Sequence, residues 1–261
     1  MGSPTIWSSG RYDAVGERIA PIAAAVVDAA ARRRALGGAD VVDLACGTGS
    51  AALAAATRGA RVTGVDYTPE LIAIAQGRDG SQTVTWRVGD ASDTGLPAST
   101  FDVAVSNMGI IFVDPDRQVT EIVRLLKPAG VLAFSAWVRN ASNPLFDPVV
   151  AVLGAPAQSA FSPDQWGDAA ILTERLGSHF ADIDIRPAEH RWEFESMAAA
   201  LHWLRAESPV HVETFRRADS AQQELLATEF ERALRPHQER SGAIAFTSPY
   251  VVVSARMSHS A

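Results

Sequence analysis

The chain has few of the residues that several kinds of site require. Cys46 is its one cysteine, which excludes an internal disulfide and a zinc site built from cysteines. No run of apolar residues approaches the roughly 20 needed to span a bilayer, and the first residues lack the apolar segment of a signal peptide. The sequence therefore predicts a cytoplasmic chain.

Lysine is also scarce. Lys127 is the one lysine, and the formal net charge is −7. Such a surface repels phosphate backbones and anionic lipids, so neither nucleic acid nor a membrane is expected as a partner. The one basic run, 32–34, follows an alanine-rich stretch and is typical of a solvated helix end. Hydrophobic residues make up 47% of the chain, which predicts a sizeable core.

What the sequence does contain, from Asp40 onward, is an alternation of short apolar runs and helical stretches. Strands are predicted at 41–45, 61–66, 83–88, 101–106 and 130–137, with helices at 50–57, 69–76 and 115–126. Apolar strands separated by helices of this length are typical of a parallel sheet with helices on both faces. The sequence therefore predicts an α/β fold.

The segments around this core follow a different pattern. The spacing before it predicts two helices within 12–35, the second with Pro21 in its first turn. After it come a helix at 168–176 and a strand at 182–195 with a break near Pro187. We expect one domain over 1–261, made of an N-terminal helical flap (1–38), the core (39–137), an irregular insertion (138–167), lid helices (196–243) and a final strand (244–256).

The most informative stretch is VVDLACGTGS, residues 41–50. The predicted strand enters the loop Gly-Thr-Gly at 47–49, whose glycines let the backbone turn sharply and approach a ligand with no Cβ in the way. Asp43 lies at the carboxyl end of that strand, and this edge is where ligands collect in open α/β sheets. The glycine loop alone is weak evidence, and Asp43 makes it a candidate binding site.

Two more acidic residues follow strands in the same way. A carboxylate at Asp66 can accept hydrogen bonds from the two hydroxyls of a ribose, and one at Asp90 can accept from an adenine amino group. Taken alone, Asp90 is equally typical of a turn or a helix cap. Three acids after three successive strands favour a ligand site.

Five motifs occur here in one order and spacing: VVDLACGTGS, GVDYTPELIAIAQ, GDASDTGLP, FDVAVSN and LLKPAGVLAFSAW. Through them, residues 41–137 resemble the class I S-adenosylmethionine-dependent methyltransferases, especially the small-molecule group related to ubiquinone and menaquinone biosynthesis enzymes. The resemblance implies a Rossmann-like sheet of seven strands, mostly parallel, with the last strand antiparallel to the rest. It also implies S-adenosylmethionine as cofactor, S-adenosylhomocysteine as product, and no metal.

The resemblance assigns a role to each matching residue. It places Asp43, Ala45, Gly47, Thr48 and Gly49 at the methionine end of the cofactor, Asp66 at the ribose, Tyr67 at the adenine face, Asp90 and Ala91 at the adenine edge, and Ser106, Asn107 and Met108 beneath the sulfonium. A looser likeness at Trp7, Gly10 and Tyr12 indicates a flap that closes over the cofactor. Ordinary packing explains Trp7 and Tyr12 equally well.

The sulfonium of this cofactor already activates the methyl group, so the protein mainly has to align an acceptor and exclude water. A hydroxyl or amine acceptor also benefits from a base, and histidine suits neutral pH. His211, after the helix start Ser208-Pro209, is the candidate base. A packing role for His211 is the alternative. Cys46 is a small packing residue of the loop, since no histidine stands near it in sequence.

The expected acceptor is a small, mainly apolar aromatic or natural-product-like molecule that is methylated on oxygen. Its candidate pocket residues are aromatic side chains at or after the last matching strand, namely Trp137, Phe146, Trp166 and Trp203. The same side chains equally well form the core of a lid. The sequence leaves a homodimer open.

The sequence leaves three other functions open. Gly47, Gly49 and Ala52 also satisfy the G-x-G-x-x-A pattern of NAD(P)-dependent oxidoreductases. Two features disfavour an oxidoreductase. Such enzymes do not usually need an acid at the position of Asp43, and residues 120–126, before the one lysine, include no tyrosine for a Tyr-x-x-x-Lys pair. A non-catalytic protein that binds S-adenosylmethionine for regulation is the second alternative. The same cofactor used for another reaction is the third.

Overall fold

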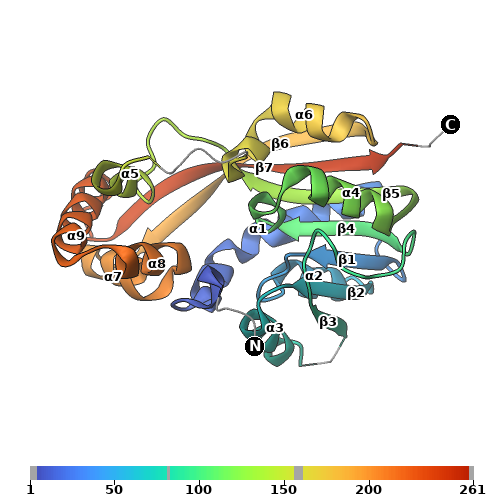
Figure 1. Cartoon of the computed structure of the whole chain (residues 1–261), viewed down its shortest axis with the longest axis horizontal. Helices are drawn as coiled ribbons and strands as arrows, with labels where there is room; N and C mark the ends of the chain where they lie inside the picture. The colour runs from blue at the N-terminus through green and yellow to red at the C-terminus, as the bar shows by residue number, and fades with distance from the viewer. Residues whose placement is uncertain (1–4, 81–82, 156–160, 259–261) are drawn as a thin grey trace. The chain divides into compact units, whose positions relative to one another are not determined.

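The structure, a computed structural model, describes residues 5–80, 83–155 and 161–258, so part of the predicted insertion (156–160) lies outside the described residues. Seven strands form one sheet in the order β3-β2-β1-β4-β5-β7-β6 (Figure 1). Their bounds are β1 (Asp40–Leu44), β2 (Arg61–Asp66), β3 (Val84–Val88), β4 (Phe101–Asn107), β5 (Leu126–Trp137), β6 (Phe180–Phe194) and β7 (Ile244–Met257).

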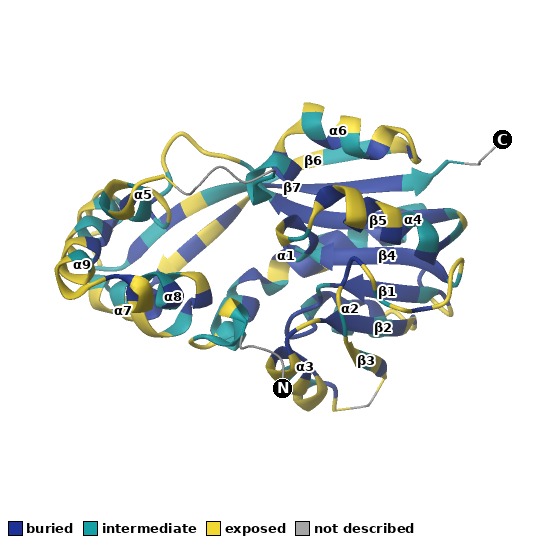
Figure 2. Ribbon diagram, in the orientation of Figure 1, coloured by how far each residue is buried: buried dark blue, intermediate teal, exposed yellow. Residues whose placement is uncertain are grey.

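The strands β3, β2, β1, β4 and β5 pair in parallel, whereas β7 is antiparallel to β5, with Trp137 opposite Tyr250. The helices α2 (Ser50–Ala56), α3 (Pro69–Arg78) and α4 (Pro115–Leu125) connect the parallel strands. The inner strands are buried along almost their whole length (Figure 2), which explains why their sequences are continuous apolar runs. The predicted Rossmann-like sheet of seven strands with its last strand antiparallel is confirmed.

The chain divides into two compact units. The sheet unit comprises Ile19–Arg139, Phe161–Ala188 and Pro249–Ala261, and it includes α6 (Ala169–Gly177). The small unit comprises Met1–Arg18, Asn140–Ala160 and Glu189–Ser248. Within the small unit are α5 (Asp147–Leu153), α7 (Met197–His202), the π-helical turn η4 (Trp203–Glu207), α8 (Pro209–Arg217) and α9 (Ser220–Leu234). The predicted lid segment, 196–243, lies in the small unit.

Two prolines do not interrupt their elements as the sequence predicts. Pro21 lies inside one continuous helix, α1 (Tyr12–Arg33), rather than between two helices. The helix loses one backbone hydrogen bond there, and the buried side chains on either side of it, Ile19, Ile22 and Val26, hold it in place. Pro187 lies inside the continuous strand β6, because β6 is the last strand of the sheet and an edge strand tolerates a missing donor.

The predicted irregular insertion, 138–167, also contains more structure than expected. It includes α5 and the 3-10 turn η3 (Pro163–Gly167). Its prolines 148 and 163 occupy the first turn of α5 and of η3. A backbone N–H in the first turn of a helix has no acceptor within the helix, so proline, which lacks this N–H, loses no hydrogen bond there. The prolines therefore start helices here rather than prevent them.

The turn η3 packs directly on the backbone at the end of β5. A Cβ at Gly167 would lie 2.1 Å from the carbonyl oxygen of Trp137 and 2.9 Å from the Cα of Val138. We expect Gly167→Ala to lower the free energy of unfolding by about 3 kcal/mol, because one of the two backbones must move. Thermal or urea unfolding measures the change. Gly177→Ala is the control: nothing lies within 4 Å of its Cβ position, and an equal loss there would contradict the packing argument.

Candidate functional site

The loop after β1 has an unusual backbone. Three of its residues have positive φ angles, with values of 52° at Ala45, 55° at Gly47 and 84° at Gly49. A Cβ at Gly49 would lie 2.4 Å from the indole ring of Trp86, so both the angle and the space require glycine there. The loop then enters α2 at Ser50. The glycines are therefore needed for the turn that the sequence predicted.

Asp66, at the end of β2, connects this loop to the next one. Its Oδ2 accepts from the backbone N–H of Gly47 and its Oδ1 from that of Thr68, both at 2.9 Å. The side chain is buried, and this burial raises the pKa of the carboxyl above its ordinary value, against the two backbone donors, which lower it. The hydroxyl of Thr68 is a third donor to this carboxyl, which leaves at least one of its roughly four lone-pair sites open. Asp66 thus orders the glycine loop and can still accept hydrogen bonds from a ligand.

Asp43, near the end of β1 and just before the same loop, is fully buried. Its Oδ2 accepts from the N–H of Ala52 at 2.8 Å, in the first turn of α2. Among the described residues, its Oδ1 has no hydrogen-bond partner. Burial raises the pKa of Asp43 to about 8, and the nearby charge of Asp66 acts in the same direction. Neither acid forms an ion pair with a described residue, so the pair suits a positively charged ligand.

The loop after β4 packs on the loop after β1. The hydroxyl of Ser106 donates to the carbonyl of Leu44 at 2.7 Å and accepts from the N–H of Ile110 at 3.1 Å. A Cβ at Gly109 would lie 2.3 Å from the carbonyl oxygen of Ala45. Because of these contacts, the loops after β1, β2 and β4 form one connected edge of the sheet unit.

The predicted residues Asn107 and Met108 lie in the same loop. Met108 is buried with a positive φ of 57°. Its N–H donates to the hydroxyl of Ser135 at 3.1 Å, and that hydroxyl donates to Oδ1 of Asn107 at 2.9 Å. A non-glycine residue with positive φ is uncommon and needs such support. Asn107 and Met108, which are predicted to form the wall beneath the sulfonium, are therefore held in place by Ser135.

The acid after β3 differs from the other two. Asp90 is exposed, and its Oδ1 accepts from both the N–H and the hydroxyl of Ser92 at 2.8 Å. Its Oδ2 lies 3.4 Å from a guanidinium nitrogen of Arg117. The turn-forming alternative thus describes part of its role, and the adenine contact stays a prediction. Ala91 is buried, and Tyr67 is 49% exposed.

The predicted flap residues lie in the small unit. Trp7 and Tyr12 make an edge-to-face contact with ring centres 5.9 Å apart. A Cβ at Gly10 would lie 2.6 Å from the carbonyl oxygen of Glu207, and the N–H of Arg11 donates to that carbonyl at 2.8 Å. This segment therefore packs on η4, which explains the glycine. The flap over the cofactor stays a prediction.

The four predicted pocket aromatics are divided between the two units, Trp137 and Trp166 in the sheet unit and Phe146 and Trp203 in the small unit. Trp166 is 0% exposed and packs edge-to-face on Phe134 in the sheet unit, and Trp203 is 3% exposed in the small unit. Both are core residues, which is the packing alternative. Trp137 is partly exposed beside Tyr250, and Phe146 is 49% exposed. The acceptor role of these side chains stays a prediction.

His211 uses both ring nitrogens within the small unit. Its Nε2 lies 2.7 Å from the carbonyl of Leu145, which can only accept, so Nε2 carries the proton. Its Nδ1 then accepts from the hydroxyl of Ser208, also at 2.7 Å. Burial lowers the pKa of His211 to about 4, so the ring is neutral at pH 7. No lone pair remains to take a proton from an acceptor, and the base role stays a prediction that this geometry does not support.

We expect His211→Ala to lower the free energy of unfolding by about 2–4 kcal/mol, because it leaves two polar groups unpaired and a cavity. In the wild type, the folded pKa of about 4 lies below the ordinary 6.5. The contribution of this histidine to the free energy of unfolding is therefore fully present above pH 6.5 and is lost as the pH falls toward 4. Thermal unfolding between pH 4 and 8 measures both effects. His202→Ala, at an exposed position, is the control, and an equal loss there would contradict this role.

Sequence reasoning missed Trp86. Its ring lies against Gly49 and also against Gly64, where an added Cβ would lie 2.7 Å from the ring. Gly64 of β2 pairs with Trp86 of β3, so the indole covers the space beside a glycine on the neighbouring strand. The only signal in the sequence was a glycine in one strand and a tryptophan in the next. The pairing register is needed to connect them.

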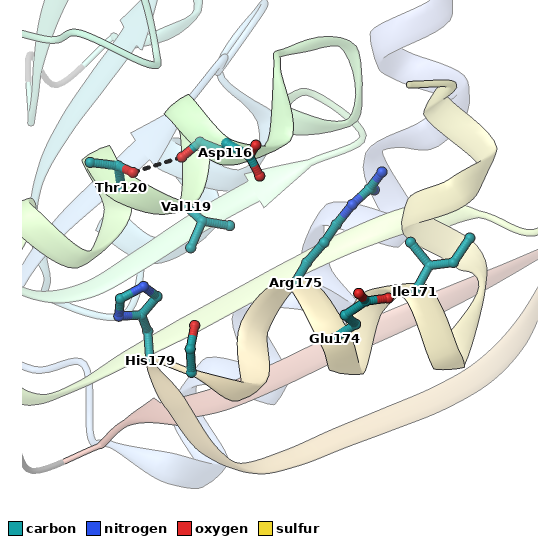
Figure 3. A pocket seen from close by; sticks show the side chains of 8 residues that line it. Asp116, Val119, Thr120, Ile171, Glu174, Arg175 and His179 are labelled. Atoms are coloured by element: carbon teal, nitrogen blue, oxygen red, sulfur yellow. Dashed lines mark hydrogen bonds between the residues drawn. The ribbon is translucent and has the colours of Figure 1, made fainter. Parts of the chain in front are cut away.

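A separate surface hollow of about 470 Å³ lies between α4 and α6 (Figure 3). Its lining includes Asp116, Glu174, Arg175 and His179. No predicted site residue lines it. Within the described parts of the chain, no three His, Cys, Asp or Glu side chains are grouped to hold a metal ion. In the same parts, no helix is both long and apolar enough to cross a membrane.

The sheet order, the antiparallel last strand and the loop geometry define the class I methyltransferase fold. Residues 42–134 match the family model described as a methyltransferase domain. A putative type II methyltransferase from Anaeromyxobacter dehalogenans has a similar structure, with a TM-score of 0.60 and 25% identity over 91% of this chain and 95% of that one. The resemblance predicted from the sequence is confirmed for residues 42–134, which match a methyltransferase domain.

Two relatives show how far the likeness extends. An uncharacterized protein of Mycobacterium tuberculosis is 33% identical over 66% of this chain and 64% of its own length. The nocamycin O-methyltransferase of Saccharothrix syringae is 34% identical over 50% of this chain and 48% of its own length. The chain thus spans less than two thirds of the length of these curated relatives.

Proposed function

We propose that this protein transfers the methyl group of S-adenosylmethionine to a small-molecule acceptor. The observation that carries the proposal is the pair of buried acids around the glycine loop. Asp43 has an oxygen without a partner among the described residues, and neither Asp43 nor Asp66 forms an ion pair there. Two buried acids without an ion pair, whose pKa values burial raises, fit a ligand that carries positive charge and hydroxyl donors, because a nearby cation favours the charged form of a carboxyl. S-adenosylmethionine has both.

The same pair disfavours the oxidoreductase alternative. A dinucleotide would place an anionic pyrophosphate at the N-terminus of α2. There the N–H of Ala52 already donates to Asp43, and Asp66 accepts from Gly47 of the loop. A pyrophosphate would compete for these donors, and its negative charge would raise the pKa values of the two acids further, whereas a cation would lower them. The site therefore suits a sulfonium rather than a pyrophosphate.

The residues expected to hold the cofactor are those named from the motifs. They are Asp43, Ala45, Gly47, Thr48 and Gly49 for the methionine part, Asp66 for the ribose, Tyr67, Asp90 and Ala91 for the adenine, Ser106, Asn107 and Met108 for the wall, and Trp7 and Tyr12 for the flap. When bound, the sulfonium supplies an activated methyl group and a neutral leaving group. The chain itself binds, orients and excludes water, and such positioning can contribute about 7–11 kcal/mol.

We propose an aromatic or natural-product-like acceptor that is methylated on oxygen. The likeness to an O-methyltransferase and the partly exposed rings of Trp137 and Phe146 support this choice. Incubation with methyl-labelled S-adenosylmethionine and a panel of phenols, quinones and amines tests it. We expect label in phenolic products. Label only in protein or RNA would overturn the acceptor class, and no transfer despite tight cofactor binding would favour a regulatory role.

A further inference from the structure

Gln118 of α4 is a fully buried amide that contacts the loop after β3, within the sheet unit. It is 0% exposed, and its Nε2 donates to the backbone carbonyl of Ala91 at 3.0 Å. Among the described residues, its Oε1 has no hydrogen-bond partner. A buried amide oxygen without a donor costs free energy, so packing alone would favour an apolar side chain at this position. The amide therefore indicates a role beyond stability.

The carbonyl that Gln118 holds belongs to the peptide group between Ala91 and Ser92. The N–H of the same peptide group, on Ser92, donates to Oδ1 of Asp90 at 2.8 Å, and the hydroxyl of Ser92 donates to that oxygen at the same distance. Because a peptide group is planar, the bond to Gln118 and the bond to Asp90 fix one plane from both sides. Gln118 thereby helps to fix the direction of the carboxylate of Asp90.

The same helix holds the following part of this loop independently. Glu121, which lies three residues after Gln118 on α4, is buried. Its Oε1 accepts from the N–H of Thr94 at 2.9 Å and from the hydroxyl of Thr94 at 2.5 Å. These bonds do not involve the turn at 90–92. Loss of the bond from Gln118 is therefore expected to release this turn while the rest of the loop stays attached to α4.

The turn at 90–92 carries the two residues predicted at the adenine edge, Asp90 and Ala91. A carboxylate oxygen of Asp90 can accept from the 6-amino group of adenine. The N–H of Ala91 has no acceptor among the described residues and can donate to N1 of the base. Hypoxanthine has the opposite pattern, with a hydrogen on N1 and an oxygen at position 6. One acceptor and one donor, both held in place, therefore complement adenine and not hypoxanthine.

We propose that Gln118 is a positioning residue that makes the cofactor site select adenine over hypoxanthine; this rests on the proposed function. Gln118 holds the peptide group between Ala91 and Ser92, so that the carboxylate of Asp90 and the N–H of Ala91 meet the base edge together. A site rejects an analogue strongly when the analogue leaves its fixed polar groups unpaired. Without the bond from Gln118 the turn can rotate, and the wrong base is tolerated.

Calorimetry with S-adenosylhomocysteine and S-inosylhomocysteine measures this selection, because the two ligands differ only at N1 and position 6 of the base. The full-length protein is titrated with each. We expect the wild type to bind S-adenosylhomocysteine at least about tenfold more tightly, since hypoxanthine leaves two polar groups unpaired. Gln118→Met, which has a similar volume and no donor, should lower this preference to about threefold or less.

Val119→Ala is the matched control. Val119 is the next residue of α4 and is also buried, but it lines the hollow between α4 and α6 (Figure 3). Its truncation leaves a cavity, so it should lower the midpoint of thermal unfolding and keep the preference for adenine. Gln118→Met should lower the midpoint less, because it removes the unpaired Oε1 together with the hydrogen bond. The ratio of the two affinities thus separates positioning from stability.

Equal binding of the two ligands by the wild type would overturn the inference and leave the proposed function intact. A full preference in Gln118→Met, or a lost preference in Val119→Ala, would do the same. Binding of neither ligand by the wild type would overturn the inference and the proposed function together. If Gln118→Met does not fold, Gln118→Asn decides by the same ratio, because its amide is one methylene group too short to reach the carbonyl of Ala91.

Discussion

Replacement of Asp66 by alanine is expected to weaken binding of S-adenosylhomocysteine by more than 100-fold. The change removes the proposed acceptor for the ribose hydroxyls, and it leaves the N–H groups of Gly47 and Thr68 without the bonds that order the glycine loop. Hydrogen bonds to a charged group contribute about 1.5–3 kcal/mol each, so two of them account for a loss of this size. Calorimetry at pH 7.5 measures it.

Asp90→Ala is the matched control for that change. Asp90 also follows a strand, but it is exposed and its carboxylate already bonds Ser92 and faces Arg117. We expect its replacement to weaken binding by about tenfold or less, since it makes at most one contact to the adenine edge. If the two substitutions weakened binding equally, Asp66 would have no special role in the site.

Asp43→Asn is expected to stabilise the protein without ligand and to weaken its binding of S-adenosylmethionine. Burial raises the pKa of Asp43 from 3.8 to about 8. The folded state therefore binds a proton that the unfolded state releases, and stability is complete below about pH 4 and falls as the pH rises toward 8. Asparagine has no proton to lose. We expect the variant to be more stable by about 2–4 kcal/mol at pH 7.

The stability difference should vanish near pH 4, which urea unfolding at several pH values would show. Burial also raises the pKa of Asp66. The stability of the variant should therefore still fall as the pH rises, but less steeply than that of the wild type. Binding should fall at least tenfold for S-adenosylmethionine and less for its uncharged-sulfur product. The proposed reason is that the bound sulfonium keeps Asp43 deprotonated as its counter-charge, which asparagine cannot supply. Asp102→Asn should destabilise instead, because the backbone N–H of Asp40 and then the cations Lys127 and Arg34 lower the pKa of Asp102. A stability difference independent of pH would contradict the buried acid.

The sheet could be predicted from the sequence because its signals are local. Apolar runs such as 101–106 are buried on both faces, so their composition identifies them as strands without reference to the rest of the chain. The effect of proline could not be predicted in this way. Pro21 and Pro187 are tolerated because of the packing of α1 and the edge position of β6, and both depend on long-range neighbours.

The candidate site likewise has parts that local motifs predict and parts that depend on residues distant in sequence. Asp43, Asp66 and the glycine loop follow from motif and strand position, and the structure brings them together. The bond from Ser106 to the carbonyl of Leu44 joins residues far apart in sequence, and no pattern could indicate it. His211 illustrates the opposite error. A histidine near a helix start suggested a catalytic base. In the structure its ring accepts from the hydroxyl of the nearby Ser208 and donates to the backbone carbonyl of Leu145, which is distant in sequence.

The central claim is that one positively charged adenosyl ligand occupies the edge formed by the glycine loop and the two buried acids. Titration calorimetry of the purified protein with S-adenosylmethionine, its demethylated product and NADH tests it directly. The account predicts single-site binding of the first two and none of the third. Heat with NADH alone, or with none of the three, would contradict it.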